Sequence, residues 1–191
     1  LVPLLCDAEK SPLSGQNDLN IGKVKQLKLK LMHSKIYQIT EERIGEDNYI
    51  TERTFDEGRN DFYDYCADID EDDRNYAIES LAKNLLPTGM FTLVEKDTLI
   101  YNGGAEEWKD NWVKLIHQKA KAITPENITE WIGEAYTLEK ELLNPLDIGS
   151  RFVTDTFPSN DAQQSGDFMK MICGLEPGAK LYIGGVVDFH W

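Results

Sequence analysis

Apolar and polar residues alternate in several short stretches of the chain, and this alternation predicts strands. From Leu27 to Leu31 every second residue is lysine, the pattern of a strand that buries one face and leaves the other in water. Residues 35–44 and 48–55 follow a similar pattern, and the sequence Gly-Glu-Asp-Asn between them is typical of a turn. We therefore expect these two stretches to form an antiparallel hairpin.

Further strands are expected later in the chain. Residues 90–94 and 98–101 read as a second hairpin around Lys96 and Asp97, residues 151–154 as a short strand, and residues 180–187 as the most strand-like run of all. Gly184 and Gly185 interrupt this last run. Paired glycines inside a strand indicate a bulge or a close approach of another backbone segment.

Helical periodicity appears in four segments. A helix is expected from an N-cap at Asp72 or Asp73 to about residue 86, followed by others over residues 105–123, 124–144 and 165–173. Trp108 and Trp112 recur at helical spacing with aliphatic residues in the second of these helices, and Trp131 belongs to the apolar stripe of the third. We expect all three tryptophans to lie in the core. Residues 56–72 fit neither periodicity clearly.

Together these elements predict an α+β fold. Strands that come as hairpins favour a mostly antiparallel sheet, and the pattern predicts three to five helices packed on it. Residues 1–20 are rich in Pro, Ser, Gly and Asn without periodicity, so we expect an irregular N-terminal arm. Residues 21–191 are then expected to form a single domain.

Charge changes this picture most. The chain has 20 basic and 34 acidic residues, a formal net charge of −14. Residues 41–73 contain fourteen acids and three arginines and so carry −11 of that charge, which leaves −3 for all other residues. Phosphate contacts need Lys and Arg, so this segment excludes direct binding to nucleic acid or to an anionic membrane and favours a cationic partner.

Aromatic residues lie among these acids, as in surfaces that combine electrostatic steering with aromatic anchors. We therefore expect an acidic interaction protein, an inhibitor or nucleic-acid mimic, that docks a basic protein partner. The expected partner-binding residues are Glu52, Asp56, Asp61, Tyr63, Asp64, Tyr65, Asp68 and Asp70. The alternative interpretation is a solvated acidic face that only aids solubility.

Part of this segment resembles a calcium-binding loop of the EF-hand kind over twelve residues. Asp68, Asp70, Asp72 and Glu79 occupy the first, third, fifth and twelfth positions, where such loops place oxygen ligands. The sixth position is Asp73 where the sharp turn of that loop needs glycine, and no second loop follows. Apart from calcium at these four residues, no cofactor is expected.

Asp188 and His190 form the second group with chemical potential. Two residues apart on one strand, they point to the same face, and a carboxylate beside an imidazole can act as a general base. This pair predicts a small, hydrolase-like enzyme as the alternative function. No nucleophile motif and no phosphate-binding glycine loop accompanies it, so the binding hypothesis is favoured.

The cysteines bear on the compartment. Cys6, Cys66 and Cys173 are few and widely spaced, which argues against a disulfide framework and favours reduced thiols in a cytoplasmic protein. No apolar run is long enough to span a membrane. The sequence Leu-Leu-Cys at residues 4–6 keeps open the alternative of a lipid-anchored protein outside the cytoplasm.

Overall fold

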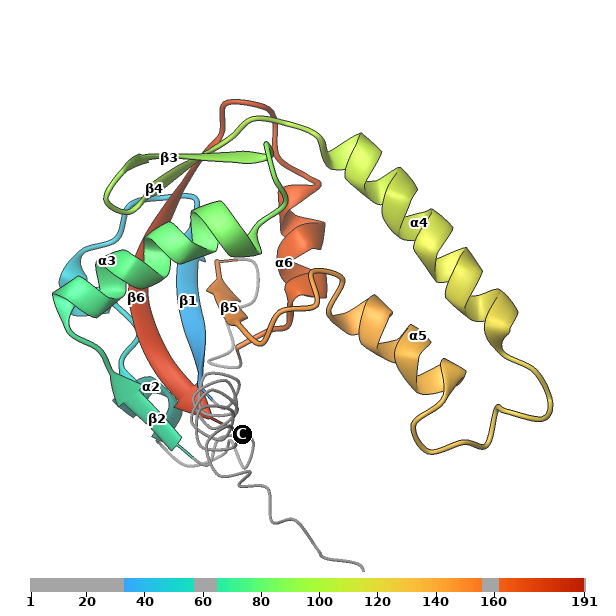
Figure 1. Ribbon diagram of the computed structural model, residues 1–191. Coiled ribbons are helices and arrows are strands. Elements are labelled where there is room, and N and C mark those ends of the chain that lie inside the picture. The colour runs from blue at the N-terminus through green and yellow to red at the C-terminus, as the bar shows by residue number, and fades with distance from the viewer. Residues whose placement is uncertain (1–32, 57–64, 156–161, 191) are drawn as a thin grey trace, which may run out of the picture. The chain divides into compact units, whose positions relative to one another are not determined.

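The computed structural model describes residues 33–56, 65–155 and 162–190 (Figure 1). The chain divides into two units, residues 1–32 and 33–191, and all described residues belong to the second. The arm expected over residues 1–20 and the strand expected from Leu27 to Leu31 therefore lie outside the described residues.

A six-stranded mixed sheet forms the centre of the described unit. Its order is β3-β4-β6-β1-β5, and every neighbouring pair is antiparallel except β1 and β5. The short strand β2 pairs with one end of β6, and β4 pairs with the other end of the same edge. The strands are β1 (Ser34–Thr40), β2 (Tyr65–Asp68), β3 (Phe91–Glu95), β4 (Thr98–Tyr101), β5 (Arg151–Thr154) and β6 (Lys180–His190). The expected α+β class with a mostly antiparallel sheet is confirmed.

Five α-helices accompany the sheet in the described residues. They are α2 (Glu52–Asp56), α3 (Glu71–Ser80), α4 (Ala105–Ala122), α5 (Glu134–Leu143) and α6 (Ser165–Ile172). A π-helical turn, η2 (Leu81–Leu85), continues α3, and a short 3-10 turn, η1 (Glu46–Asn48), lies between β1 and α2.

The two faces of the sheet bury different residues. On the face that α3 and α6 cover in Figure 1, Tyr37 and Phe152 pack with Ile78 and Phe168 in the larger apolar cluster. Alternate residues of the same strands point the other way: Ile36, Val187 and Phe189 pack with Ile50 and with Phe55 of α2. Side chains alternate across a strand, so one strand can serve both clusters.

Most of the expected elements are present, and two are wrong. Residues 48–55 do not form a hairpin strand: they contain the end of η1 and helix α2, where Thr54 Oγ1 accepts a hydrogen bond from Thr51 N at 2.9 Å. Residues 125–132 are turns and not helix. The Asn127 side chain stabilises this turn, because its Oδ1 accepts a hydrogen bond from Thr124 N at 2.8 Å and its Nδ2 donates one to Ala122 O at 2.9 Å.

Helices α4 and α5 form a helical hairpin, and the two helices pack mainly against each other (Figure 1). Trp112 Nε1 donates to Glu141 O at 3.1 Å, and Lys119 pairs with the Glu141 carboxylate at 3.1 Å. Trp108 packs against the larger cluster, but Trp131 in the connecting turn is 91% exposed. The expectation of a core role is therefore wrong for Trp131.

Candidate functional site

Four acids of the segment lie at the beginning of α3. Asp70 caps this helix, and its Oδ1 accepts from Asp73 N at 2.8 Å. The cap lies two or three residues before Asp72 or Asp73, the positions that the sequence predicts. Glu71, Asp72 and Asp73 form the first turn, where carboxylates complement the positive end of the helix. All four side chains are exposed.

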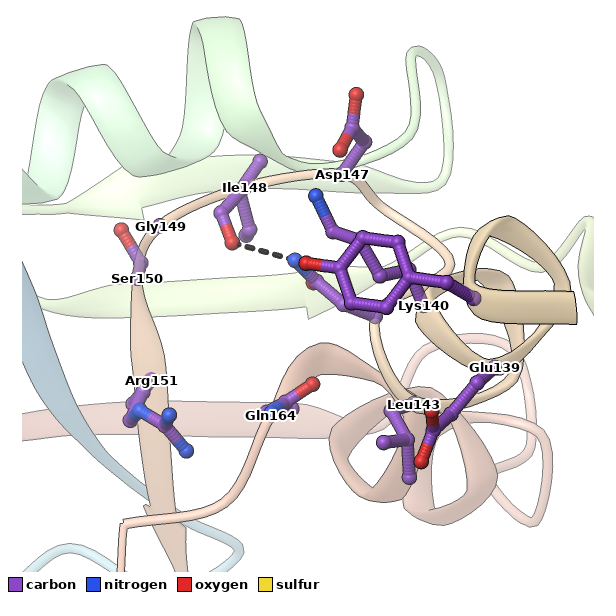
Figure 2. A pocket seen from close by; sticks show the side chains of 11 residues that line it. Glu139, Lys140, Leu143, Asp147, Ile148, Gly149, Ser150, Arg151 and Gln164 are labelled. Atoms are coloured by element: carbon purple, nitrogen blue, oxygen red, sulfur yellow. Dashed lines mark hydrogen bonds between the residues drawn. The ribbon is translucent and has the colours of Figure 1, made fainter. Parts of the chain in front are cut away.

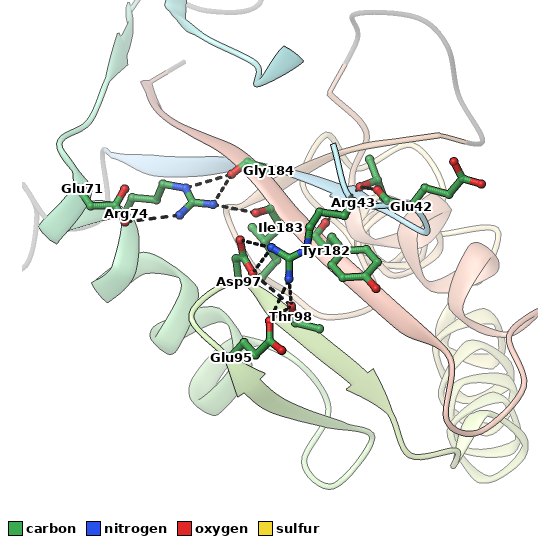
Figure 3. Close-up of polar contacts among 11 residues, drawn as sticks. Glu42, Arg43, Glu71, Arg74, Glu95, Asp97, Thr98, Tyr182, Ile183 and Gly184 are labelled. Carbon is green, nitrogen blue, oxygen red and sulfur yellow. Dashed lines mark hydrogen bonds and ion pairs between the residues drawn. The ribbon is translucent and has the colours of Figure 1, made fainter. Parts of the chain in front are cut away.

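Arg74 anchors this helix end to the sheet, as Figure 3 shows. Its Nε and Nη2 donate to Gly184 O at 3.0 and 2.8 Å, and Nη2 also donates to Ile183 O at 2.8 Å. These carbonyls lie on β6 between the stretches that pair with β4 and β2. The Arg74 side chain, which is only 12% exposed, therefore donates to two carbonyls in a stretch of β6 that pairs with neither β4 nor β2.

The same arginine brings η1 next to α3. Its Cζ lies 5.2 Å from the centre of the Tyr49 ring, a cation–π contact. Glu46 and Asp47 in η1 are exposed, like the carboxylates of the first turn of α3. We call the set Glu46, Asp47, Asp70, Glu71, Asp72 and Asp73 the acidic surface.

Few bases neutralise the acidic surface. Within the described part of the chain, its one ion pair is a long contact of 3.9 Å between Glu71 and Arg74. Glu46, Asp47 and Asp72 have no ion-pair partner among the described residues. The net negative charge of this surface is therefore available to solvent or to a partner.

Some predicted partner-binding residues have structural roles. Asp68 Oδ1 accepts from Glu52 N at 2.7 Å, so Asp68 caps α2, and Glu52 Oε2 accepts from Asp68 N at 3.4 Å in return. This reciprocal contact ties α2 to β2. Asp61, Tyr63 and Asp64 lie outside the described residues, and so does the side chain of Asp56.

Two of the fourteen acids lie in a separate group. Glu41 and Glu42 follow β1, and Figure 3 shows Glu42 beside Arg43, on the other side of the Tyr182–Gly184 stretch from Glu71. Arg43 pairs with Glu95 at 2.9 Å and with Asp97 at 3.2 Å. Its Cζ also lies 4.8 Å from the centre of the Tyr182 ring. The acids of residues 41–73 thus do not form one continuous cluster.

Among the described residues, Tyr76 and Tyr65 are the exposed aromatic residues of this acidic segment. Tyr76 is 71% exposed and lies one helical turn after Asp72 and Asp73 on α3. Tyr65 is 47% exposed and sits in β2, where its ring meets that of His33 edge-on at 5.6 Å. Of these two tyrosines, Tyr76 lies beside the acidic surface, and Tyr65 belongs to a second polar group.

That second group gathers around Asp188. Its Oδ2 pairs with His33 Nδ1 at 2.9 Å, and its Oδ1 accepts from Lys35 Nζ at 2.6 Å. The His190 ring lies 5.8 Å from that of His33. Antiparallel pairing of β1 with β6 places residues 33–35 beside residues 188–190. Sequence reasoning found Asp188 and His190 but missed His33 and Lys35, because only strand pairing brings them there.

The calcium ligands expected from the sequence do not share one loop. Asp70, Asp72 and Glu79 lie at the cap and within α3, and Asp72 and Glu79, seven residues apart, are separated by about 10 Å along the helix axis. Glu79 pairs with Lys83 at 2.7 Å. Within residues 33–56, 65–155 and 162–190, no three His, Cys, Asp or Glu side chains lie close enough to hold a metal ion.

The glycine pair of β6 has a packing role. A Cβ added at Gly185 would lie 2.7 Å from Ile50 N, and one added at Gly184 would lie 2.6 Å from Gln38 Oε1. Gln38 Oε1 accepts from both Ile50 N and Gly185 N at 3.0 Å. The expected close approach of another backbone segment is confirmed, and this segment fills the space beside the glycines.

Comparison of the chain with protein-family models, curated proteins and solved structures finds no match. In the part of the chain that the structure describes, the helices are too short or too polar to cross a lipid bilayer. Arguments about function therefore rest on the residues themselves.

Proposed function

We propose that this protein is a binding module that docks a cationic protein partner through the acidic surface. The main support is a set of exposed carboxylates for which the described residues supply few counter-charges. The helix dipole accounts for acids in the first turn of α3. It does not account for Glu46 and Asp47, which lie on η1 and are held next to α3 through Tyr49 and Arg74.

Tyr76 supplies an anchor beside this charge. An exposed tyrosine can bury a large apolar area at low entropic cost and still donate a hydrogen bond. Charge then accelerates the encounter with a basic partner, and the aromatic ring contributes to holding it. The proposed partner is accordingly a protein that presents lysines and arginines around an apolar depression.

A matched pair of triple variants tests this proposal. The first, Glu46→Gln/Asp47→Asn/Asp72→Asn, neutralises the acidic surface. The control, Glu107→Gln/Glu130→Gln/Glu176→Gln, removes three exposed carboxylates elsewhere. Both variants have a net charge of −11 in place of −14. The probe is a fluorescent lysine- and arginine-rich peptide containing one leucine cluster, measured by anisotropy at low salt.

The first variant should bind the peptide roughly tenfold more weakly, since each exposed charge pair contributes up to about 1 kcal/mol. The control variant should lose much less affinity, and Tyr76→Ala should weaken binding without changing its salt dependence. Equal losses in the two triple variants would show that only total charge matters. In that case the acidic surface is a solubility feature and the proposal is wrong.

The Asp188 group supports a second candidate function, a small enzyme that uses acid–base chemistry. With Nδ1 of His33 directed at Asp188, Nε2 is left to face outward as a base, and the carboxylate holds the ring in that orientation. His33 is 47% exposed at the side chain, so a substrate can reach it. This observation moves the expected base from His190 to His33.

Hydrolysis of p-nitrophenyl acetate, a generic ester substrate, distinguishes this candidate. His33→Ala and Asp188→Asn should both abolish activity above background, while His117→Ala, which removes an exposed histidine on α4, should not. If all three variants lower the rate by similar amounts, the activity is that of any exposed imidazole and the enzyme hypothesis is rejected.

A further inference from the structure

Exposed apolar side chains are concentrated on the α4–α5 hairpin. Of the eleven large apolar side chains that are exposed in the described residues, eight lie between residues 113 and 143. Helix α5 contains no buried residue. Apolar side chains that gather on one surface of a protein mark a site where another molecule binds. The hairpin is therefore a candidate interface.

One face of α5 carries four exposed residues, Tyr136, Glu139, Lys140 and Leu143. Their spacing of i, i+3, i+4 and i+7 places them on the same side of the helix. All four line a cavity of about 420 Å³, which also borders the segment after α5 and the residue before α6 (Figure 2). We call these four residues the α5 face.

The two charges on the α5 face have no ion-pair partner within the described residues. No ion pair there includes Glu139 or Lys140. The helix itself cannot supply one, because the residues three and four positions before and after each of them are uncharged. Lys140 Nζ lies 5.9 Å from the centre of the Tyr136 ring. One acid and one base are therefore available to a partner.

The order of residues on the α5 face is self-complementary. A twofold axis midway between Glu139 and Lys140 brings two copies of α5 together in antiparallel directions. Tyr136 then meets Leu143 of the second copy, and Glu139 meets Lys140 of the second copy, once on each side of the axis. A parallel arrangement would place each charge beside its like, which is unfavourable. The charges therefore favour an antiparallel pair.

The turn before α5 adds the two most exposed of these apolar residues, Trp131 at 91% and Ile132 at 75%. In an antiparallel pair, the beginning of one α5 lies beside the end of the other, where Leu143 and Asn144 line the cavity. A cavity of about 150 Å³ holds a benzene ring, so a cavity of about 420 Å³ has room for an indole ring. The second copy thus offers a place for Trp131, which its own chain leaves exposed.

We propose that α5 forms the interface of a symmetric homodimer, in which each copy seats Trp131 in the cavity beside the other copy's α5. This interface involves neither the acidic surface nor the Asp188 group. Two helices of ten residues bury less area than a standard protein interface, so the dimer is weak and reversible, with a dissociation constant of about 10 μM. At concentrations well below this value the copies are separate and Trp131 is exposed.

Sedimentation equilibrium of the full chain from about 1 to 200 μM, at about 0.15 M salt to screen its net charge, measures this association. The wild type should change from monomer to dimer. Glu139→Lys and Lys140→Glu each place like charges together on both sides of the axis and should weaken association at least about tenfold. Glu107→Lys and Lys114→Glu, at exposed positions on α4, change the net charge by the same amounts and should leave the dissociation constant within about twofold.

Mixing the two α5 variants gives the sharpest test. The Glu139→Lys chain presents two positive charges on the α5 face, and the Lys140→Glu chain presents two negative ones. A mixed pair therefore has opposite charges at both contacts, so the mixture should dimerise at least as tightly as the wild type although neither variant does so alone. Energy transfer between two differently labelled variants measures this, and its recovery also shows that both variants are folded.

Trp131→Ala should weaken association more than about thirtyfold, as expected for a buried aromatic anchor, whereas Tyr76→Ala, which removes an exposed aromatic residue from α3, should not. Association that is lost in each α5 variant and restored in their mixture supports the proposal. A wild type that is monomeric at 200 μM, α5 variants that associate like the α4 controls, a mixture that stays monomeric, or equal association of Trp131→Ala and Tyr76→Ala would overturn it.

Discussion

The acidic surface and the α4–α5 hairpin use charge and apolar residues in opposite ways. On the hairpin, lysines form ion pairs with nearby glutamates: Lys119 pairs with Glu141, and Lys109 pairs with Glu106. At the beginning of α3, carboxylates accumulate and the nearby Arg74 is engaged with backbone carbonyls. The body of the fold buries its large apolar residues, whereas the hairpin turn exposes Trp131 and Ile132. Charge segregation, and not charge content, therefore distinguishes the proposed docking site.

The largest expected contrast is between two aromatic residues. Phe168 on α6 stacks on Phe152 with ring centres 4.2 Å apart, so Phe168→Ala should lower the free energy of unfolding by about 4 kcal/mol. Trp131→Ala removes a larger side chain from an exposed turn and should change it by less than about 0.5 kcal/mol. Urea unfolding measures both. A large loss for Trp131→Ala would mean that the hairpin turn is buried against something.

A second contrast concerns two glycines. Gly185→Ala places a Cβ against the Ile50 backbone and should destabilise the fold by about 3 kcal/mol, because backbone atoms there have little room to move. Gly45→Ala is the matched control, since a Cβ at Gly45 meets nothing within 4 Å. Thermal melts that rank these variants equally would contradict the packing of residues 45–50 against β6.

Sequence reasoning predicted local structure better than tertiary placement. The hairpin of β3 and β4, helices α3, α4 and α6, and strands β5 and β6 follow from periodicity and capping residues within each segment. Strand β2 was missed because four residues among acids carry too little pattern. The expected strand over residues 48–55 failed because its apolar residues, Ile50 and Phe55, are buried by a turn and a short helix in place of a sheet edge.

The same division applies to the candidate sites. Acid clustering was visible in the sequence, but the role of Asp68 as a cap and of Arg74 as a sheet anchor depends on contacts far along the chain. His33 joined Asp188 only through strand pairing across 155 residues.

Arg74 lies beside the acidic surface and also donates hydrogen bonds to the backbone of β6. Arg74→Ala leaves two β6 carbonyls without their donors and should cost about 2 kcal/mol. Arg74→Lys restores the charge but not the planar fork, so it should recover less than half of that loss. Guanidinium unfolding would compare them. Full recovery by lysine would show that charge near the acids matters more than the hydrogen bonds to β6.

The smallest expected effect is a pH dependence. Burial raises the pKa of the Tyr37 phenol, whose oxygen donates to Ala77 O at 3.2 Å. The folded state therefore keeps this proton at pH values where the unfolded chain releases it. This contribution to stability is fully present below pH of about 10 and is lost as pH rises above it. In Tyr37→Phe, the decline of stability in alkali should be shallower than in the wild type.

The salt dependence of peptide binding tests the central claim most directly. The wild-type protein and the Glu46→Gln/Asp47→Asn/Asp72→Asn variant are titrated with the basic peptide at a series of ionic strengths. If the acidic surface is the docking site, affinity should fall with added salt in the wild type, and the variant should show a clearly smaller slope than the control triple variant. Identical slopes in the two triple variants would contradict the claim that charge gathered around η1 and α3 is directed at a cationic partner.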